Sequence, residues 1–324
     1  MKQYTLNNHF IQGFNNVPFN NRIFSSDRYF ASYGRASKEM SLSDAIDEAA
    51  DQVINSVDKE IYLCFSGGID SEVMVQTFLK KNYPFKIALF RFSNGENDHD
   101  IKYAKEFCQK NDIEDRVLVY QLNFHDWFNS TECKHVLDTS GSTNVTQLYL
   151  CWLIQSINNV NAFPVIANGD PYINRSVPAD LKIRPYTFTT YNEQVQDSWY
   201  LTASEDIVGT TFRFANNNDL DLYPYFFTQT PNVFRAFFKD PYITNMISTP
   251  DKYFYDYIDR FKMYSQYYSL QPRPRYHGTE NLENNDKYKE IIKGIHPNHS
   301  SKYRIKYADL LALTAPEGSG HISV

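Results

Sequence analysis

Residues 61–81 have the sequence IYLCFSGGIDSEVMVQTFLKK. The short apolar run 61–65 predicts a buried strand, and the apolar positions in 73–79 recur at helical spacing. Between them lies the hexapeptide 66–71, SGGIDS, which contains two of the chain's 12 glycines. Pro84 follows and ends the predicted helix. The stretch therefore predicts a strand, a glycine turn and a helix in direct succession.

The same alternation continues along the chain on both sides of this unit. A helix is predicted over 41–57, strands over 85–91, 116–122 and 163–167, and helices over 98–110 and 144–157. Strands that alternate with helices favour an α/β fold with a doubly wound parallel sheet. Ligands of such sheets bind at the carboxyl edge, where the order of the strands reverses. Residues 66–71, 91–98 and 168–170 are expected at that edge.

Three segments are expected. Residues 1–40 are interpreted as an irregular or short-strand N-terminal segment, 41–172 as an α/β domain, and 173–324 as a mixed β/α extension on the substrate side. Within these segments, 123–143 is expected to be irregular. Helices are predicted over about 230–246 and 251–268, and short helices over 288–295 and 302–313.

Composition excludes several classes of protein. The 324 residues carry 32 Lys and Arg against 38 Asp and Glu, a net charge of −6, which argues against a nucleic-acid partner. The four cysteines form no CxxC pair, so zinc-knuckle and thiol-redox spacings are missing. The first residues have no apolar leader, and no run is long enough for a membrane span. We expect a cytoplasmic protein.

The hexapeptide has the composition of an anion-binding loop. Gly67 and Gly68 let the backbone turn sharply and approach a large anion. The N–H groups at the following helix N-terminus favour pyrophosphate, and the Ser66 and Ser71 hydroxyls can add hydrogen bonds. Asp70 can hold Mg²⁺. The chain contains neither GxxxxGK[ST] nor GxGxxG at this position, so a P-loop kinase and a dinucleotide oxidoreductase are disfavoured.

SGGIDS resembles SGGxDS, the PP-loop of the N-type ATP pyrophosphatases, a superfamily with an adenine nucleotide alpha hydrolase-like fold. The nearest resemblance is to the synthetase domain of asparagine synthetase, and it covers about residues 60–172. It implies a doubly wound sheet, ATP and Mg²⁺ as cofactors, and cleavage of ATP into AMP and pyrophosphate. A substrate carboxylate or carbonyl would be adenylated, and an amide or other C–N bond would follow.

The resemblance also implies residue roles. Ser66, Gly67, Gly68, Ile69, Asp70 and Ser71 would bind the pyrophosphate of ATP, with Asp70 on the metal. Phe90 and Arg91 correspond to the positions at which the backbone of family members contacts adenine. Residues 97–113, which include Asp100, Tyr103 and Ala104, resemble a pattern that opens the next helix in asparagine synthetase. The turn 168–170 resembles a later motif of the family, although the Glu of that motif is missing here. The resemblance implies that Gly169 would contact the nucleotide and Asp170 the metal. The implied catalytic set is Asp70, Ser71 and Asp170.

Several alternatives stay open from the sequence. No glutaminase precedes the loop, so ammonia would be free or come from a separate donor, or the nucleophile would be an amine on a substrate. The rivals are a nucleotide-binding protein without turnover, a sulfonucleotide reductase and a base-modifying enzyme. Cys133 is expected in a polar loop open to chemistry, whereas Cys151 is expected as inert packing. Oligomeric state and substrate identity do not follow from these residues.

Overall fold

The computed structural model describes residues 11–17, 29–33, 35–140, 145–167, 172–175, 199–202, 225–227, 230–248, 257–273, 286, 304–306, 311–312 and 315–316. Its strands are β1 Ile11–Val17, β2 Tyr29–Tyr33, β3 Glu60–Cys64, β4 Lys86–Phe92, β5 Val117–Leu122, β6 Ala162–Ile166, β7 Tyr172–Arg175, β8 Trp199–Thr202, β9 Tyr225–Phe226 and β10 Arg304–Lys306. Its helices are α1 Leu42–Ser56, α2 Ile69–Lys80, α3 Asp98–Lys110, the 3₁₀ turn η1 Glu114–Arg116, α4 Phe124–Trp127, α5 Thr131–Ser140, α6 Val145–Asn159, α8 Pro231–Lys239, α9 Pro241–Ser248 and α10 Tyr257–Tyr264.

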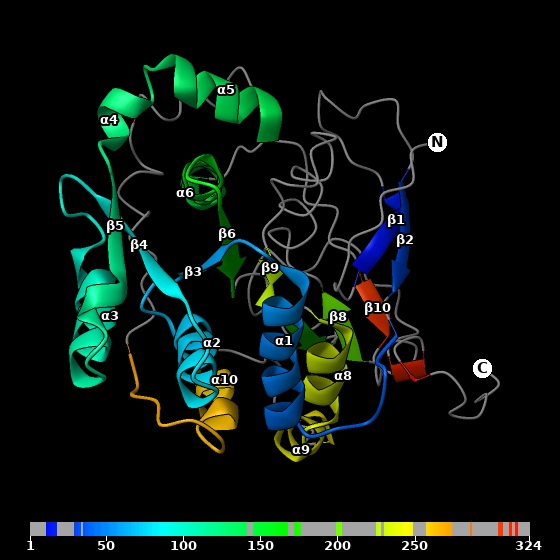
Figure 1. The fold of residues 1–324 in the computed structure, drawn as a ribbon. Helices are drawn as coiled ribbons and strands as arrows, with labels where there is room; N and C mark the ends of the chain where they lie inside the picture. The colour runs from blue at the N-terminus through cyan, green and yellow to red at the C-terminus, as the bar shows by residue number, and fades with distance from the viewer. Residues whose placement is uncertain are drawn as a thin grey trace.

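The centre of the molecule is a five-stranded sheet with the order β5-β4-β3-β6-β9 (Figure 1). Every pair of neighbouring strands in it is parallel. The predicted α/β class with a parallel sheet is therefore confirmed. Two smaller antiparallel sheets, β1-β2 and β10-β8-β7, accompany it.

Helices cover both faces of the central sheet (Figure 1). Side chains of α1, α2, α3 and α8 form one core with Leu63, Leu89 and Val165 of the strands. Side chains of α4, α5 and α6 form a second core with Tyr62, Phe90 and Ile166. Consecutive strand residues thus point into opposite cores, which explains why β3 and β4 are apolar almost throughout.

The strand order places β3 beside both β4 and β6. From β3 the chain proceeds outward through β4 to β5, then returns through α4, α5 and α6 to β6 on the other side of β3. The order therefore reverses at β3, and the crevice at its carboxyl end is the expected ligand position for such a sheet.

Two predicted segments differ from the structure. Residues 123–143, expected to be irregular, contain α4 and α5. The Asn123 side chain caps α4 through the Asp126 N–H, and the buried rings of Phe124 and Trp127 pack into the core. The few apolar positions between polar residues concealed both helices from a search for periodicity.

The C-terminal half also departs from expectation. The helix predicted over 230–246 begins as predicted, with the Thr230 hydroxyl accepting from the Val233 N–H, but it ends at Lys239. The Asp240 backbone leaves the helical region, and Pro241, which has no N–H, begins α9. Residues 304–306, expected within a helix, form β10, which pairs with β8.

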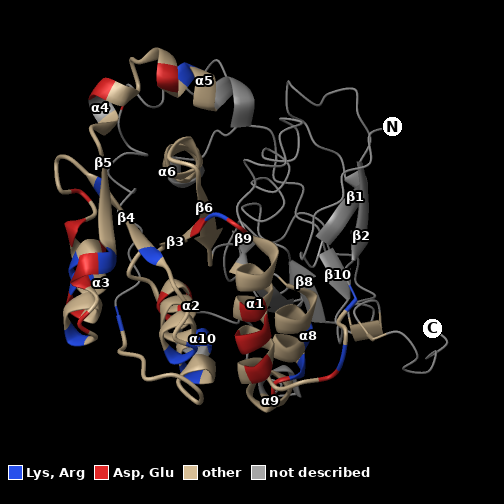
Figure 2. Ribbon diagram, viewed as in Figure 1, with Lys and Arg blue, Asp and Glu red and all other residues tan. Residues whose placement is uncertain are grey.

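Residues beyond 172 contribute to the central fold. β9 extends the sheet beside β6, and Phe227, Phe234 and Tyr264 are buried in the core that holds α1 and α2. These contacts join residues from both sides of the predicted boundary at residue 172, and the division into domains stays a prediction. Within the described ranges, no helix has the length and apolar character needed to cross a membrane. α3 carries charged residues of both signs, whereas the sequence of α6 contains none (Figure 2).

Candidate nucleotide site

The hexapeptide 66–71 connects the carboxyl end of β3 to the first turn of α2. The Phe65 N–H donates to the Ala88 carbonyl at 3.0 Å, which keeps the chain beside β4 until the loop begins. Gly67 then has φ +84°, a region that residues with a side chain rarely adopt, and α2 starts at Ile69. The predicted strand–loop–helix unit is therefore present, and it lies at the carboxyl edge.

Gly67 has a second reason to be glycine, in the helix that packs beneath it. A Cβ atom there would lie 2.4 Å from the Asp100 carbonyl oxygen and 3.4 Å from the Ala104 nitrogen. The first turns of α3 thus contact the loop backbone directly. This contact gives residues 98–104 a structural role that spacing in the sequence does not reveal.

The two loop serines form a hydrogen-bonded network that shapes the turn. The hydroxyl oxygens of Ser66 and Ser71 are 3.0 Å apart. Ser71 donates to the Gly68 carbonyl at 2.9 Å, and the Gly68 N–H donates to Ser66 Oγ at 3.2 Å. These bonds hold both hydroxyls at the start of α2, where they can reorient toward an anion.

The N-terminus of α2 has no side-chain cap among the described residues. Gly68 occupies the cap position, so it supplies no oxygen to the N–H groups of Ile69, Asp70 and Ser71 in the first turn. A 12-residue helix also places partial positive charge at this end. The loop therefore presents donors and a positive dipole end to the space above β3, as an anion site requires.

Asp70 faces a cation from a distant part of the chain. Its Oδ2 accepts a hydrogen bond from Arg260 Nη1 of α10 at 3.1 Å, and the two side chains are only 17% and 14% exposed. Its Oδ1 is buried and accepts no hydrogen bond from the described residues. A buried carboxylate oxygen without a donor suits a hard cation.

One carboxylate oxygen near the loop is available to a cation, and this donor fits Mg²⁺. Within the described residues, no group of three or more His, Cys, Asp or Glu side chains could enclose a metal. Mg²⁺ is commonly held by one or two carboxylates together with water and substrate phosphates. Asp70 beside the loop could supply one such carboxylate.

A cavity of about 100 Å³ opens beside the loop, between β3, β4, β6 and α6. Ser66, Gly68, Asp70 and Ser71 line its polar end. The remaining wall is mostly apolar and consists of Cys64, Phe65, Ala88, Phe90, Tyr149, Leu150, Leu153, Ile166 and Ala167. An apolar slot that ends at an anion loop matches a ligand with a flat ring and a phosphate chain.

Phe90 and Tyr149 form the aromatic wall of this cavity. Their rings are stacked, with centroids 4.5 Å apart and planes inclined by 16°. The sequence predicts Phe90 at the site but not Tyr149, because the run 148–154 of α6, LYLCWLI, is apolar throughout and no face of it stands out. Burial raises the pKa of the neighbouring Cys64 thiol to about 12, so this thiol is no nucleophile at neutral pH.

Arg91 does not line the cavity. Its side chain forms a two-bond ion pair with Asp98, with Nε–Oδ1 and Nη2–Oδ2 distances of 2.7 and 2.8 Å. The hydrogen bonds from Arg91 lower the pKa of Asp98. Gly169 and Asp170 lie outside the described residues, so their predicted roles stay predictions. Ala167, the last described residue before them, lines the cavity.

Both cysteines considered for chemistry are buried. Cys133, expected in a polar loop, lies in α5 with 0% exposure, and burial raises the pKa of its thiol to about 12. The expectation of a loop cysteine open to chemistry is wrong, because Val136 and Cys133 point into the same core as α6. Cys151 is buried as expected.

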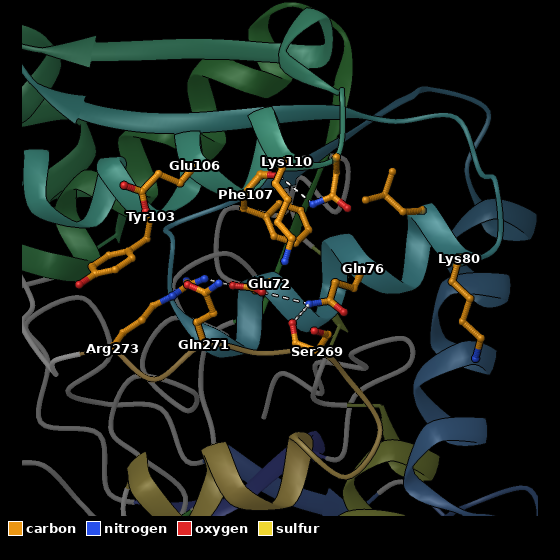
Figure 3. Close-up of a pocket in the computed structure, with 12 residues that line it drawn as sticks. Glu72, Gln76, Lys80, Tyr103, Glu106, Phe107, Lys110, Ser269, Gln271 and Arg273 are labelled. Carbon is orange, nitrogen blue, oxygen red and sulfur yellow. Dashed lines mark hydrogen bonds and ion pairs between the residues drawn. The ribbon is translucent and has the colours of Figure 1, made fainter.

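A second cavity of about 380 Å³ lies between α2, α3 and residues 269–273 (Figure 3). Arg273 forms an ion pair with Glu72, both nearly buried, and its guanidinium lies 5.1 Å from the centre of the Tyr103 ring. Burial lowers the pKa of Arg273 to about 10. Gln76 donates to the Ser269 carbonyl at 3.1 Å, so the segment that follows α10 is fixed to α2.

Arg260 is the site residue that sequence reasoning missed most clearly. It lies 190 residues from Asp70 in a helix with many aromatic residues, and no local pattern links it to the loop. Comparison of the chain with models of protein families and with curated protein sequences found no match. The case for function therefore rests on the loop sequence and on this geometry.

Proposed function

We propose that the chain is an ATP pyrophosphatase-type enzyme that adenylates a substrate carboxylate or carbonyl and then forms an amide or related C–N bond. The observation that carries the proposal is the SGGIDS loop with its uncapped helix N-terminus and the buried, donor-free Oδ1 of Asp70. The resemblance of this loop to the PP-loop supports the assignment. A doubly wound sheet of the PP-loop type is part of the same proposal.

The loop side chains and backbone would bind the phosphates. The N–H groups of 69–71 and the two serine hydroxyls would contact the β- and γ-phosphates, and Asp70 would hold Mg²⁺, which neutralises phosphate charge. The apolar slot against Phe90 and Tyr149 would take adenine. In that arrangement the α-phosphate would lie between the loop and the apolar slot, within reach of a substrate oxygen.

The reaction then has two balanced steps. A substrate oxygen attacks the α-phosphorus, the bond between the α-phosphorus and the bridging oxygen breaks, and pyrophosphate leaves with that electron pair. With a carboxylate substrate, an amine or ammonia attacks the carbonyl carbon of the resulting acyl adenylate, the C–O bond to AMP breaks and AMP leaves with its electron pair, and the nitrogen loses a proton to solvent. Preorganised N–H groups around the departing pyrophosphate would stabilise the charge that develops there.

Product analysis tests this function. The purified chain is incubated with Mg-ATP, ammonium and a pool of carboxylate metabolites, and nucleotides are separated from phosphate and pyrophosphate. We expect AMP and pyrophosphate in equal amounts, and we expect Asp70→Asn to abolish both. Asp98→Asn, which removes a carboxylate from the start of α3 outside the cavity, is the matched control and should retain turnover.

Two results would contradict the proposal. Formation of ADP and phosphate would exclude cleavage between the α- and β-phosphates. If the chain binds Mg-ATP but forms no AMP with any substrate tested, it would be assigned to the nucleotide-binding proteins without turnover. If the pool supports AMP formation, dividing it identifies the substrate, and omission of ammonium shows whether the amine belongs to a substrate.

A further inference from the structure

The ion pair between Arg260 and Asp70 connects the C-terminal part of the chain to the first turn of α2. Both side chains are mostly buried, and the Nη1–Oδ2 distance is 3.1 Å. Asp70 therefore has two different oxygen environments, because Oδ2 faces a guanidinium and Oδ1 faces no donor among the described residues. A loop built only for an anion would not need an acid at this point.

Arg260 is held in place by the packing of its own segment. Met263 and Tyr264, on the same helix, are 0% and 1% exposed. Further along, the Tyr268 hydroxyl lies 3.3 Å from Thr77 Oγ1 of α2. The backbone that carries Arg260 is thus fixed beside α2, within reach of the phosphate loop.

Charge accounting at this point favours a change of partner. Asp70 and Arg260 together are neutral, so a divalent cation placed on Oδ1 alone would meet the guanidinium at short range. A nucleotide brings phosphate oxygens that Arg can contact with two parallel hydrogen bonds. If metal and phosphate bind together, the ion pair between Asp70 and Arg260 would be replaced by two others. Asp70 would bind the metal, and Arg260 would bind phosphate.

We propose that Arg260 is a phosphate-binding residue of this site, stored on Asp70 until nucleotide and metal arrive together. The inference rests on the proposed function and deepens it, because it makes the C-terminal part of the chain a component of the nucleotide site. Arg260 disfavours metal without nucleotide and favours phosphate when the metal is bound. Binding of Mg²⁺ and of ATP is therefore mutually dependent.

Isothermal titration of the full chain with Mg-ATP and with pyrophosphate tests this role. Arg260→Gln is expected to weaken both ligands by about tenfold or more, and Arg260→Lys to restore part of the loss. The matched control is Arg273→Gln, which removes a guanidinium paired with the same helix two residues beyond Asp70. It should leave both affinities within about twofold of the wild type, since its partner Glu72 does not line the phosphate loop cavity.

A double-mutant cycle separates phosphate contact from simple structural support. Without Mg²⁺, Asp70→Asn removes the carboxylate that competes with phosphate for Arg260, so we expect the affinity for pyrophosphate to rise. In the Arg260→Gln variant, Asp70→Asn should also raise the affinity for pyrophosphate, but the increase should be several-fold smaller. Thermal unfolding of each variant checks that the fold is retained. If Arg260→Gln does not fold, Arg260→Lys replaces it in the cycle, because Lys keeps a positive charge at this position.

The outcomes separate this inference from the proposed function. Three results would overturn the role of Arg260 and leave the proposed function standing. They are equal losses of affinity in Arg260→Gln and Arg273→Gln, unchanged affinities in Arg260→Gln, and a double-mutant cycle in which the two effects add. A wild-type chain that binds neither Mg-ATP nor pyrophosphate would remove both. Selective loss in Arg260→Gln together with a non-additive cycle would support the exchange of partners.

Discussion

Gly67 is the residue at which backbone conformation and packing make the same demand. Its φ of +84° is costly for any residue with a Cβ, and the Asp100 carbonyl fills the space that a Cβ would need. The neighbouring Gly68 has φ −75°, and a Cβ there would only come within 3.3 Å of the Ser66 hydroxyl. The two glycines of the loop are therefore unequal.

Gly67→Ala is expected to lower the free energy of unfolding by about 1–3 kcal/mol, from backbone strain and from displacement of α3. It should also abolish nucleotide binding, because the loop cannot keep its shape. Gly68→Ala is the control and should cost less than about 1 kcal/mol. Urea unfolding measures both, and equal losses in the two variants would show that the contact with Asp100 is unimportant.

At the scale of elements, β4 and α6 together form the apolar slot beside the loop. β4 contributes Ala88 and Phe90, and α6 contributes Tyr149, Leu150 and Leu153. Ala88 is 1% exposed, and its small side chain leaves part of the slot open. The slot and the phosphate loop come from different elements, so ligand parts that bind them can be weakened separately.

Ala88→Leu is expected to fill the slot, so that the affinity for Mg-ATP falls while the affinity for pyrophosphate is retained. Ala162→Leu on β6 adds the same side chain to the same core without lining the slot, and serves as the control. Each variant should lose about 1–3 kcal/mol of stability through overpacking. Titration of both variants with Mg-ATP and with pyrophosphate measures the two affinities. If Ala88→Leu weakens pyrophosphate binding as much as Mg-ATP binding, the slot is not the site of the base.

At the scale of the whole molecule, the segment before α1 is fixed to a helix about 200 residues later. Glu39 accepts hydrogen bonds from Arg235 at 2.8 Å and from Lys239 at 2.9 Å, both on α8. Partial burial of the carboxyl works against ionisation, but these two cations outweigh it and lower the pKa of Glu39 below its usual 4.5. Asn232 adds bonds to Ser37 and Glu48.

This pair predicts a pH dependence with a definite sign. Because the pKa of Glu39 is lower in the folded chain, its stabilisation is complete above about pH 4.5 and is lost as the pH falls through the folded-state pKa. Glu39 is 45% exposed, so we expect Glu39→Gln to cost about 1 kcal/mol or less near neutral pH. Urea unfolding from about pH 7 down to about pH 3 should show this difference shrinking. A difference that grows toward acid pH would contradict the assignment.

The sequence predicted those parts of the fold that depend on local pattern. The apolar runs of β3, β4 and β6 and the loop of glycines between β3 and α2 were recognisable because burial and turn geometry act on neighbours in the chain. The pairing of Arg260 with Asp70 was not, since it depends on how α10 docks across 190 residues. The position of Cys133 was missed because a helix with mostly polar residues resembles a loop.

The aromatic stack beside the loop has one further consequence. Trp152, one turn after Tyr149 on α6, packs edge-on against Phe90 with ring centroids 5.9 Å apart, and its indole N–H donates to Glu132 at 3.1 Å. A native chromophore therefore sits one ring away from the slot. Any molecule that displaces Phe90 or Tyr149 alters the surroundings of that indole, so the chain carries its own optical reporter of occupancy.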